Sequence, residues 1–142
     1  YNQDLESELP ASVQRFKREI ETADAVLLVT PEFNRTFSAA LKNAIEWGSR
    51  PWGKNSWAGK PAAIIGVTLG AIGTAVAQSH LRSIAGHIGL HVIANPEIYI
   101  SFKEGQVVDG EIADSGLKQL LSGWADTFAD WIGRLRQPTR AA

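Results

Sequence analysis

Two short segments of the sequence combine residue types that can hold a flat ligand through backbone groups. The first is Pro31-Glu32-Phe33-Asn34, in which proline fixes φ and asparagine tolerates unusual backbone angles and can cap a following helix. The second is residues 68–73, Thr-Leu-Gly-Ala-Ile-Gly, whose glycines allow close approach of the backbone. A planar heterocycle with alternating donors and acceptors on its rim suits two such loops. From their spacing alone, ordinary turns of an α/β protein are the favoured interpretation.

The elements that must position these segments alternate between helix and strand. Continuous apolar runs at residues 25–29 and 62–67 predict strands buried on both faces of a parallel sheet, and each run leads into one of the two segments. A third strand is predicted at 91–93 and 97–100, interrupted by Asn95-Pro96. Helices are predicted at about 12–20, 36–47, 72–87 and 117–135.

This alternation predicts an α/β fold with parallel strands, right-handed crossovers and helices on both faces of the sheet. Ligands of such sheets sit beyond the carboxyl ends of the strands, so both segments should face one shared crevice. The helix predicted after the second segment would begin there, and its free N–H groups favour negative charge. Such charge develops near N1 and O2 of a flavin when it is reduced.

Length and composition exclude several other classes of function. The 142 residues predict a single domain, and 14 basic against 15 acidic residues argue against nucleic acid or an anionic membrane as a partner. The sequence has no cysteine, which excludes disulfides, zinc–thiolate sites and thiol catalysis. No apolar run approaches the ~20 residues of a membrane span. We therefore expect a cytoplasmic protein.

The side chains offer little other chemistry. His80, His87 and His91 are better explained as structural or surface residues than as metal ligands, because Gly89 interrupts the helical spacing of the last two. Glu32 has the chemistry of a general acid, but a positional role is favoured. We therefore predict no metal and no catalytic side chain.

The residues of both segments also resemble a known family. ADAVLLVTPEFNRTFSAALKNAIEWGSRP, residues 23–51, is similar to the central block of the NAD(P)H-dependent FMN reductases, which include bacterial quinone and chromate reductases. AGKPAAIIGVTLGAIGTAVAQSHLRSI, residues 58–84, is similar to their next block, and Asn95-Pro96-Glu97 continues the match. The resemblance spans nearly the whole chain.

The resemblance implies a flavodoxin-like three-layer sandwich with a parallel sheet of order 2-1-3-4-5, FMN as cofactor, and a homodimer or homotetramer. The positions that it assigns to the isoalloxazine ring are Pro31, Glu32, Phe33, Asn34, Thr68, Leu69, Gly70, Ala71 and Gly73. Two departures affect this set. Phe33 replaces a common tyrosine, and Thr74 stands where a second glycine is common, which should narrow the loop.

The family begins with a strand and a loop that cradles the FMN phosphate, and nothing in this sequence resembles them. Tyr1 matches the family only after its second strand, so we expect the first two strands to be missing and the single domain to be truncated at its N-terminus. Without them, residues 25–29 would expose an apolar edge. A chain that begins at Tyr1 would lack the phosphate anchor, and we expect it to bind FMN weakly or not at all.

Residues 49–60 form a loop that we expect to lie near the crevice. Arg50 is predicted to meet the phosphate of NAD(P)H, because a guanidinium fork suits phosphate, although a solvated charge is the simpler interpretation. Trp47, Trp52 and Trp57 are interpreted as a subunit interface that covers the flavin, with packing inside one subunit as the alternative.

The function that follows is an FMN-dependent NAD(P)H oxidoreductase. NADPH or NADH would reduce the flavin, which would then reduce a quinone, free flavin, an azo compound or a metal oxyanion in a ping-pong scheme. The alternative is a flavodoxin-like electron carrier or FMN-binding protein without turnover. Carriers of this fold tend to be acidic, so a net charge of −1 disfavours that alternative.

Overall fold

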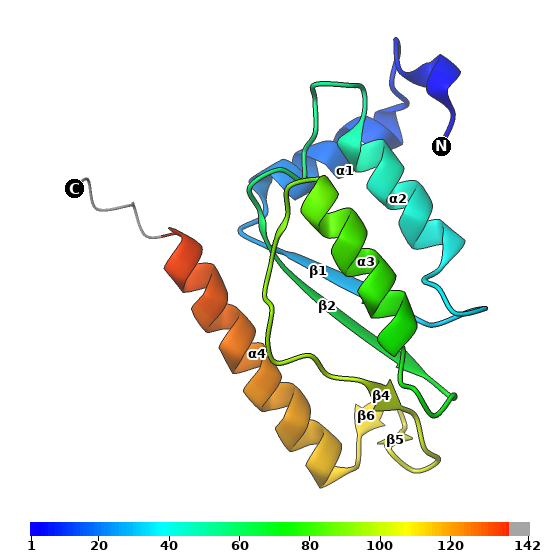
Figure 1. Cartoon of the computed structure of the whole chain (residues 1–142), viewed down its shortest axis with the longest axis vertical. Coiled ribbons are helices and arrows are strands. Elements are labelled where there is room, and N and C mark those ends of the chain that lie inside the picture. The colour runs from blue at the N-terminus through cyan, green and yellow to red at the C-terminus, as the bar shows by residue number, and fades with distance from the viewer. Residues whose placement is uncertain (137–142) are drawn as a thin grey trace.

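The computed structural model describes residues 1–136 as an α/β structure (Figure 1). A short 3-10 helix, Gln3–Leu5, precedes the main elements. These are, in chain order, α1 (Ala11–Thr22), β1 (Val26–Thr30), α2 (Ala39–Ser49), β2 (Pro61–Thr68), α3 (Ala75–His87), β3 (His91–Val92), β4 (Ile100–Ser101), β5 (Val107–Val108), β6 (Glu111–Ile112) and α4 (Ser115–Arg136). Within the described residues, no helix is both long and apolar enough to cross a membrane.

The central sheet is parallel, and β2 lies between its neighbours. β1 pairs with β2 over its whole length, with Val26 opposite Ala62 and Thr30 opposite Gly66. On the other side of β2, β3 pairs with its first residues and β4 with its last, Val67 and Thr68. β3 and β4 therefore occupy the same place in the sheet and act as one strand that is interrupted between them. The sequence predicted this interruption at Asn95-Pro96.

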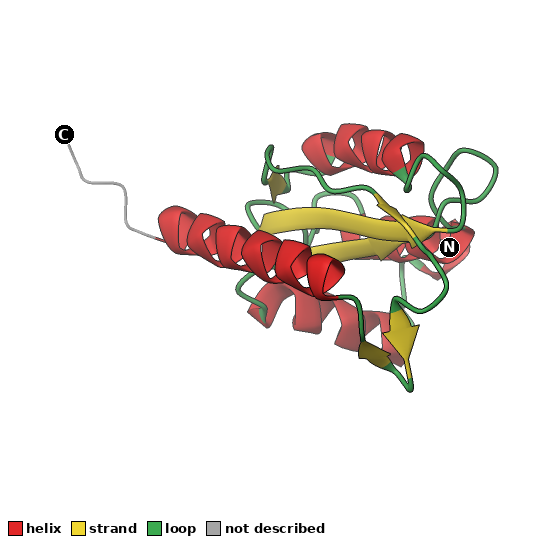
Figure 2. Cartoon of the chain, turned by 90° about the horizontal axis from the view of Figure 1, so that it is seen from below, coloured by secondary structure: helices red, strands yellow, loops and turns green. Residues whose placement is uncertain are grey.

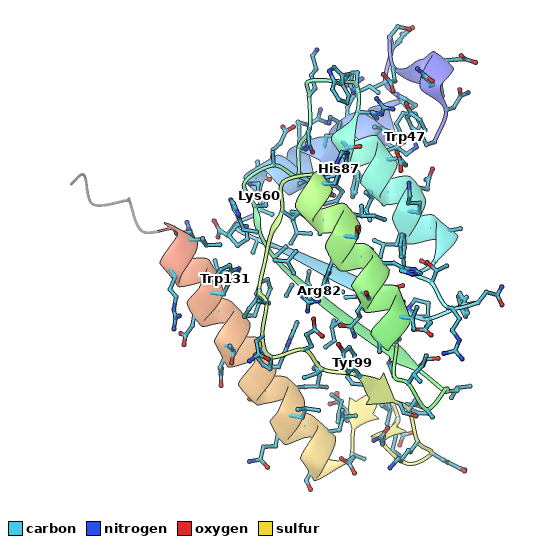
Figure 3. The ribbon with its side chains drawn as sticks, in the orientation of Figure 1. Trp47, Lys60, Arg82, His87, Tyr99 and Trp131 are labelled. Atoms are coloured by element: carbon cyan, nitrogen blue, oxygen red, sulfur yellow. The ribbon has the colours of Figure 1, made fainter. Side chains whose placement is uncertain are left out.

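Helices cover the sheet on both sides, which gives three layers (Figure 2). On one face, α1, α2 and α3 bury a core around Leu28, Ile45, Ile64 and Leu81. On the other face, α4 packs against β2 and the segment between β3 and β4. Trp131 of α4 donates its indole N–H to the carbonyl of His91, in β3, at 2.9 Å (Figure 3).

The structure corrects several predicted boundaries. α2 begins at Ala39 rather than at Thr36, and its cap is Ser38, whose Oγ accepts from the Leu41 N–H at 3.2 Å, rather than Asn34. α3 begins at Ala75, because the residues before it form a tight turn. The antiparallel hairpin of β5 and β6 was not predicted.

β1 is not buried on both faces. Leu27 and Val29 are 46% and 59% exposed, whereas Leu28 and Thr30 on the other face are buried. The reason is that α4 packs over β2 and does not extend over β1. For β2 the prediction is confirmed over its first four residues, which are all buried, but not at Val67, which is 44% exposed.

Candidate functional site

The two segments singled out in the sequence follow neighbouring strands. β1 ends at Thr30 and β2 ends at Thr68, and the two strands run in the same direction. The turns that follow them, at residues 31–36 and 69–74, therefore leave the same edge of the sheet, toward the right and lower right of the molecule in Figure 1. In parallel α/β sheets this carboxyl edge is where ligands bind.

The first turn is closed by its own backbone. The Phe33 N–H donates to the Thr36 carbonyl at 2.9 Å, and the Thr36 N–H donates back to the Phe33 carbonyl at 3.0 Å. Between them, Asn34 and Arg35 both have left-handed φ angles, of 48° and 63°. Two such residues form the tight two-residue loop that joins antiparallel strands. The turn is thus rigid, and it leaves the Phe33 side chain 63% exposed.

The second turn uses its two glycines differently. Gly73 has a φ of 57°, and a Cβ at this position would lie 2.6 Å from the backbone carbonyl carbon of Tyr99. Gly73 is therefore needed for packing against the start of β4. At Gly70 an added Cβ would meet nothing nearer than the Thr68 side chain at 3.9 Å, and the adjacent Leu69 is 82% exposed. The accessible backbone of this turn is the stretch around Gly70.

Thr74 occupies a backbone position that suits glycine. Its φ of 71° is left-handed, which is uncommon for a β-branched residue, and the side chain is fully buried. Such a conformation costs about 1–3 kcal/mol. The Thr74 hydroxyl accepts from Nε2 of Gln78 at 2.9 Å, and that same Nε2 donates to the Ile98 carbonyl at 2.9 Å. Buried hydrogen bonds thus hold the strained turn.

A carboxylate connects the two turns. Glu32 belongs to the loop at residues 31–36, and its Oε2 accepts a hydrogen bond from the backbone N–H of Ala77, the third residue of α3, at 3.0 Å. Thr74, the residue at the N-cap position of α3, makes no side-chain cap. A second contact joins Nδ1 of His80 to Oγ1 of Thr36 at 3.1 Å. Both ends of the first turn are therefore attached to α3, the helix that the second turn begins.

A polar cluster fixes the segment between β3 and β4 beside α3. Nη1 of Arg82 donates to the Ile93 carbonyl at 2.9 Å, and Nε of Arg82 lies 2.6 Å from a carboxylate oxygen of Glu97. The Tyr99 hydroxyl also bonds to Glu97, and this bond, followed by partial burial, raises the pKa of Tyr99. Figure 3 shows Arg82 and Tyr99 between α3 and this segment.

An open hollow lies beside the first turn. Its volume is about 510 Å³, and its lining is mostly apolar. The residues around it are Phe33, Asn34, Thr36, Phe37, Ser38, Ala39 and Lys42. The hollow thus adjoins the turn on the side where α2 begins.

Arg50 lies away from these turns, so the expectation that residues 49–60 border the crevice is wrong. α2 starts next to the first turn and has 11 residues, which separates its two ends by ~16 Å. Arg50 follows the far end, where it pairs with Glu6 at 3.7 Å and stacks over the Tyr1 ring at 5.8 Å. The loop is at the upper end of the molecule in Figure 1. NAD(P)H binding by Arg50 stays a prediction.

The tryptophans of this region divide between packing and exposure. Trp57 is buried and donates its indole N–H to the Ile45 carbonyl at 3.0 Å, so it packs inside the subunit. The Trp47 ring meets the Tyr1 ring edge to face, with centroids 5.0 Å apart. Trp52 is 87% exposed. Of these three tryptophans, Trp52 is therefore the strongest remaining candidate for a residue of the predicted subunit interface.

The family model for NADPH-dependent FMN reductase matches residues 1–105. This chain belongs to that family. It is 44% identical over 133 residues to a 2-hydroxy-1,4-benzoquinone reductase of a Burkholderia species, covering 93% of this chain and 73% of that protein. It is 38% identical over 138 residues to an NAD(P)H-dependent FMN reductase of Pseudomonas aeruginosa, covering 96% and 74% of the two chains.

A solved structure supports the same assignment. The flavoenzyme NAD(P)H:(acceptor) oxidoreductase FerB of Paracoccus denitrificans superposes with a TM-score of 0.89 at 45% identity, covering 94% of this chain and 74% of that chain. The fold of this FMN reductase family member is accordingly flavodoxin-like α/β with a parallel sheet. The family consists of oxidoreductases that depend on NAD(P)H and use FMN.

The contacts that hold the turns together include residues that sequence reasoning missed. Thr36, Ala77 and His80 were not predicted to belong to the site. Thr36 carried a signal, because Asn34 is a residue that favours left-handed φ and thus a two-residue turn closing at Thr36. Ala77 carried none, since it takes part through its backbone N–H alone.

Proposed function

We propose that this protein is an FMN-dependent NAD(P)H oxidoreductase that reduces quinones. The observation that carries the proposal is the pair of turns at the carboxyl edge of β1 and β2, held together through the Glu32 contact to α3. Family membership supplies the cofactor. The names of the relatives, a benzoquinone reductase among them, supply the class of acceptor.

Backbone groups of the two turns fit the rim of an isoalloxazine ring. The residues that we assign to ring binding are Pro31, Glu32, Phe33 and Asn34 in the first turn, and Thr68, Leu69, Gly70 and Ala71 in the second. Gly73 contributes indirectly, by packing the second turn against β4. FMN, when bound, would carry electrons from NAD(P)H to the acceptor. The protein would hold and orient the ring without a catalytic side chain.

The hollow beside Phe33 supports an apolar, ring-shaped acceptor. Its volume of about 510 Å³ is within the range of small-molecule sites, and its lining is mostly apolar. A quinone matches these properties better than a metal oxyanion does. Free flavin and azo compounds stay predictions from the resemblance, as does the choice between NADH and NADPH.

Further strands beside β1 belong to the same proposal. Within the described residues β1 pairs only with β2, so its other edge is unpaired. This unpaired edge supports a larger sheet of order 2-1-3-4-5, in which a strand and the FMN phosphate loop lie next to β1. A homodimer or homotetramer and a cytoplasmic location likewise stay predictions.

The test measures FMN binding and turnover on the purified protein. FMN titration should quench the flavin fluorescence, and NADPH should be consumed with 1,4-benzoquinone in steady state, with parallel double-reciprocal plots. Absence of both FMN binding and NADPH consumption contradicts the proposal. FMN binding with a single reduction and no steady-state consumption would favour the electron carrier instead.

A further inference from the structure

We propose that Glu32 is a positioning residue that sets the spacing of the two turns by capping α3 from outside the helix. Its effect on FMN rests on the proposed function, whereas the cap itself does not. The carboxylate would act through the Ala77 N–H and would not transfer a proton.

The N-terminus of α3 lacks a cap from its own residues. The residue at the N-cap position, Thr74, has a left-handed backbone, and its hydroxyl accepts from Gln78 within the helix. Ala77 is the third residue of α3, one of the positions whose N–H has no partner inside a helix. Capping normally comes from the residue just before the helix. Here it comes from Glu32, which is 45 residues earlier in the chain.

The position of Glu32 in the first turn gives this bond its consequence. Glu32 directly precedes Phe33, which begins the closed turn, and Thr36 ends that turn. Ala77 and His80, the partners of Glu32 and Thr36, are three residues apart on α3 and so lie on one face of the helix. The first turn is therefore held along α3 at both of its ends, and its distance from the second turn is set before any ligand binds.

The charge of Glu32 also affects the site. A carboxylate at a helix N-terminus offsets the partial positive charge of that terminus. The end of α3 is thus less able to stabilise negative charge on a nearby ligand than an uncapped helix would be. Glu32 therefore fixes the geometry of the two turns and at the same time weakens the electrostatic stabilisation of reduced FMN.

The experiment compares Glu32→Ala and Glu32→Gln with the matched control Glu19→Ala, which removes an exposed glutamate of α1 that forms an ion pair with Arg15. Amide hydrogen exchange at Ala77, measured by NMR without FMN, should be at least about tenfold faster in E32A. E32Q keeps a carbonyl acceptor, so its exchange should return toward that of the wild type. E19A should leave the exchange unchanged. Equal exchange at Ala77 in wild type and E32A overturns the cap.

The second readout is FMN affinity. E32A should raise the Kd for FMN at least about tenfold, and E32Q should recover most of that loss and raise the flavin midpoint potential, because a negative charge is removed. An unchanged Kd for FMN in E32A would mean that Glu32 only caps α3, and it would overturn the positioning role. Equal loss of turnover in E32Q and E32A at saturating FMN would instead indicate a proton donor and also overturn it.

A further variant keeps the test decisive if E32A does not fold. Thr36→Val removes the hydroxyl that contacts His80 and leaves Glu32 in place, so it should weaken FMN binding while leaving exchange at Ala77 unchanged. Unchanged FMN binding in this variant contradicts the claim that both ends of the turn set the spacing. If the wild type binds no FMN at all, the proposed function fails, and the exchange data still decide whether Glu32 caps α3.

Discussion

Gly70 and Gly73 lie three residues apart in the same turn, and the structure predicts opposite effects when alanine replaces each of them. At Gly73 a Cβ would lie 2.6 Å from the carbonyl carbon of Tyr99 and 2.8 Å from the N of Ile100. Both neighbours are backbone atoms, so no side-chain rotation can relieve the overlap. At Gly70 the added methyl group would meet only open space and the Thr68 side chain.

The size of the Gly73→Ala effect has three parts. The left-handed φ of 57° costs an alanine about 1–2 kcal/mol. Overpacking against a fixed backbone adds about 1–3 kcal/mol. The lower entropy of the unfolded alanine chain returns about 0.4–1 kcal/mol. G73A should therefore lower the free energy of unfolding by about 1–5 kcal/mol. G70A should change it by less than about 1 kcal/mol, toward greater stability.

FMN affinity should reveal an effect of G70A that its stability does not show. The backbone near Gly70 is the exposed part of the turn, so a methyl group there should weaken FMN binding at least about tenfold in a protein of normal stability. Urea unfolding and FMN fluorescence titration measure the two quantities on the same samples. Equal destabilisation by both variants would refute the packing argument. Unchanged FMN affinity in G70A would refute ring contact at that position.

Three further substitutions test the structure away from the site. Gly48→Ala places a Cβ 2.4 Å from the buried Trp57 indole, so it should destabilise the protein by about 1–3 kcal/mol, whereas Gly123→Ala, in open space on α4, should stabilise it by up to about 1 kcal/mol; equal effects in urea unfolding would contradict the packing. The buried Lys17 ammonium donates to the carbonyls of Gly48 and Lys54, so Lys17→Met should cost about 1–3 kcal/mol at neutral pH. Burial lowers the pKa of Lys17, so the unfolded chain binds more protons between the folded pKa and 10.5. The advantage of wild type over K17M should therefore grow as pH rises through that window, and a shrinking advantage in pH-dependent unfolding would contradict the assigned burial.

Much of the site was predictable because topology places it. Apolar runs at β1 and β2 indicated parallel strands, and parallel strands bring their following turns to one edge of a sheet. The same rule would have placed Arg50 correctly. The loop that holds it connects the end of α2 to the start of β2, so it lies at the amino edge of the sheet, opposite the turns. Only the expected position of this loop near the crevice was wrong, because the position of the loop along the chain was not weighed.

Other features depend on contacts that no local pattern encodes. The need for glycine at position 73 comes from the approach of Tyr99, and the cap on Ala77 comes from Glu32, both distant in sequence. The exposed face of β1 depends on where α4 packs.

The hairpin of β5 and β6, in contrast, did carry a local signal in the sequence, because Asp109-Gly110 is a dipeptide typical of two-residue turns and both residues have positive φ.

The most direct test of the central claim is a backbone-amide NMR titration of the protein with FMN. If the two turns bind the isoalloxazine ring, the amides of Glu32, Phe33 and Asn34 and those of residues 69–71 should shift most as FMN is added. Shifts confined to the loop at residues 50–60, or an absence of shifts in both turns at saturating FMN, would contradict the claim.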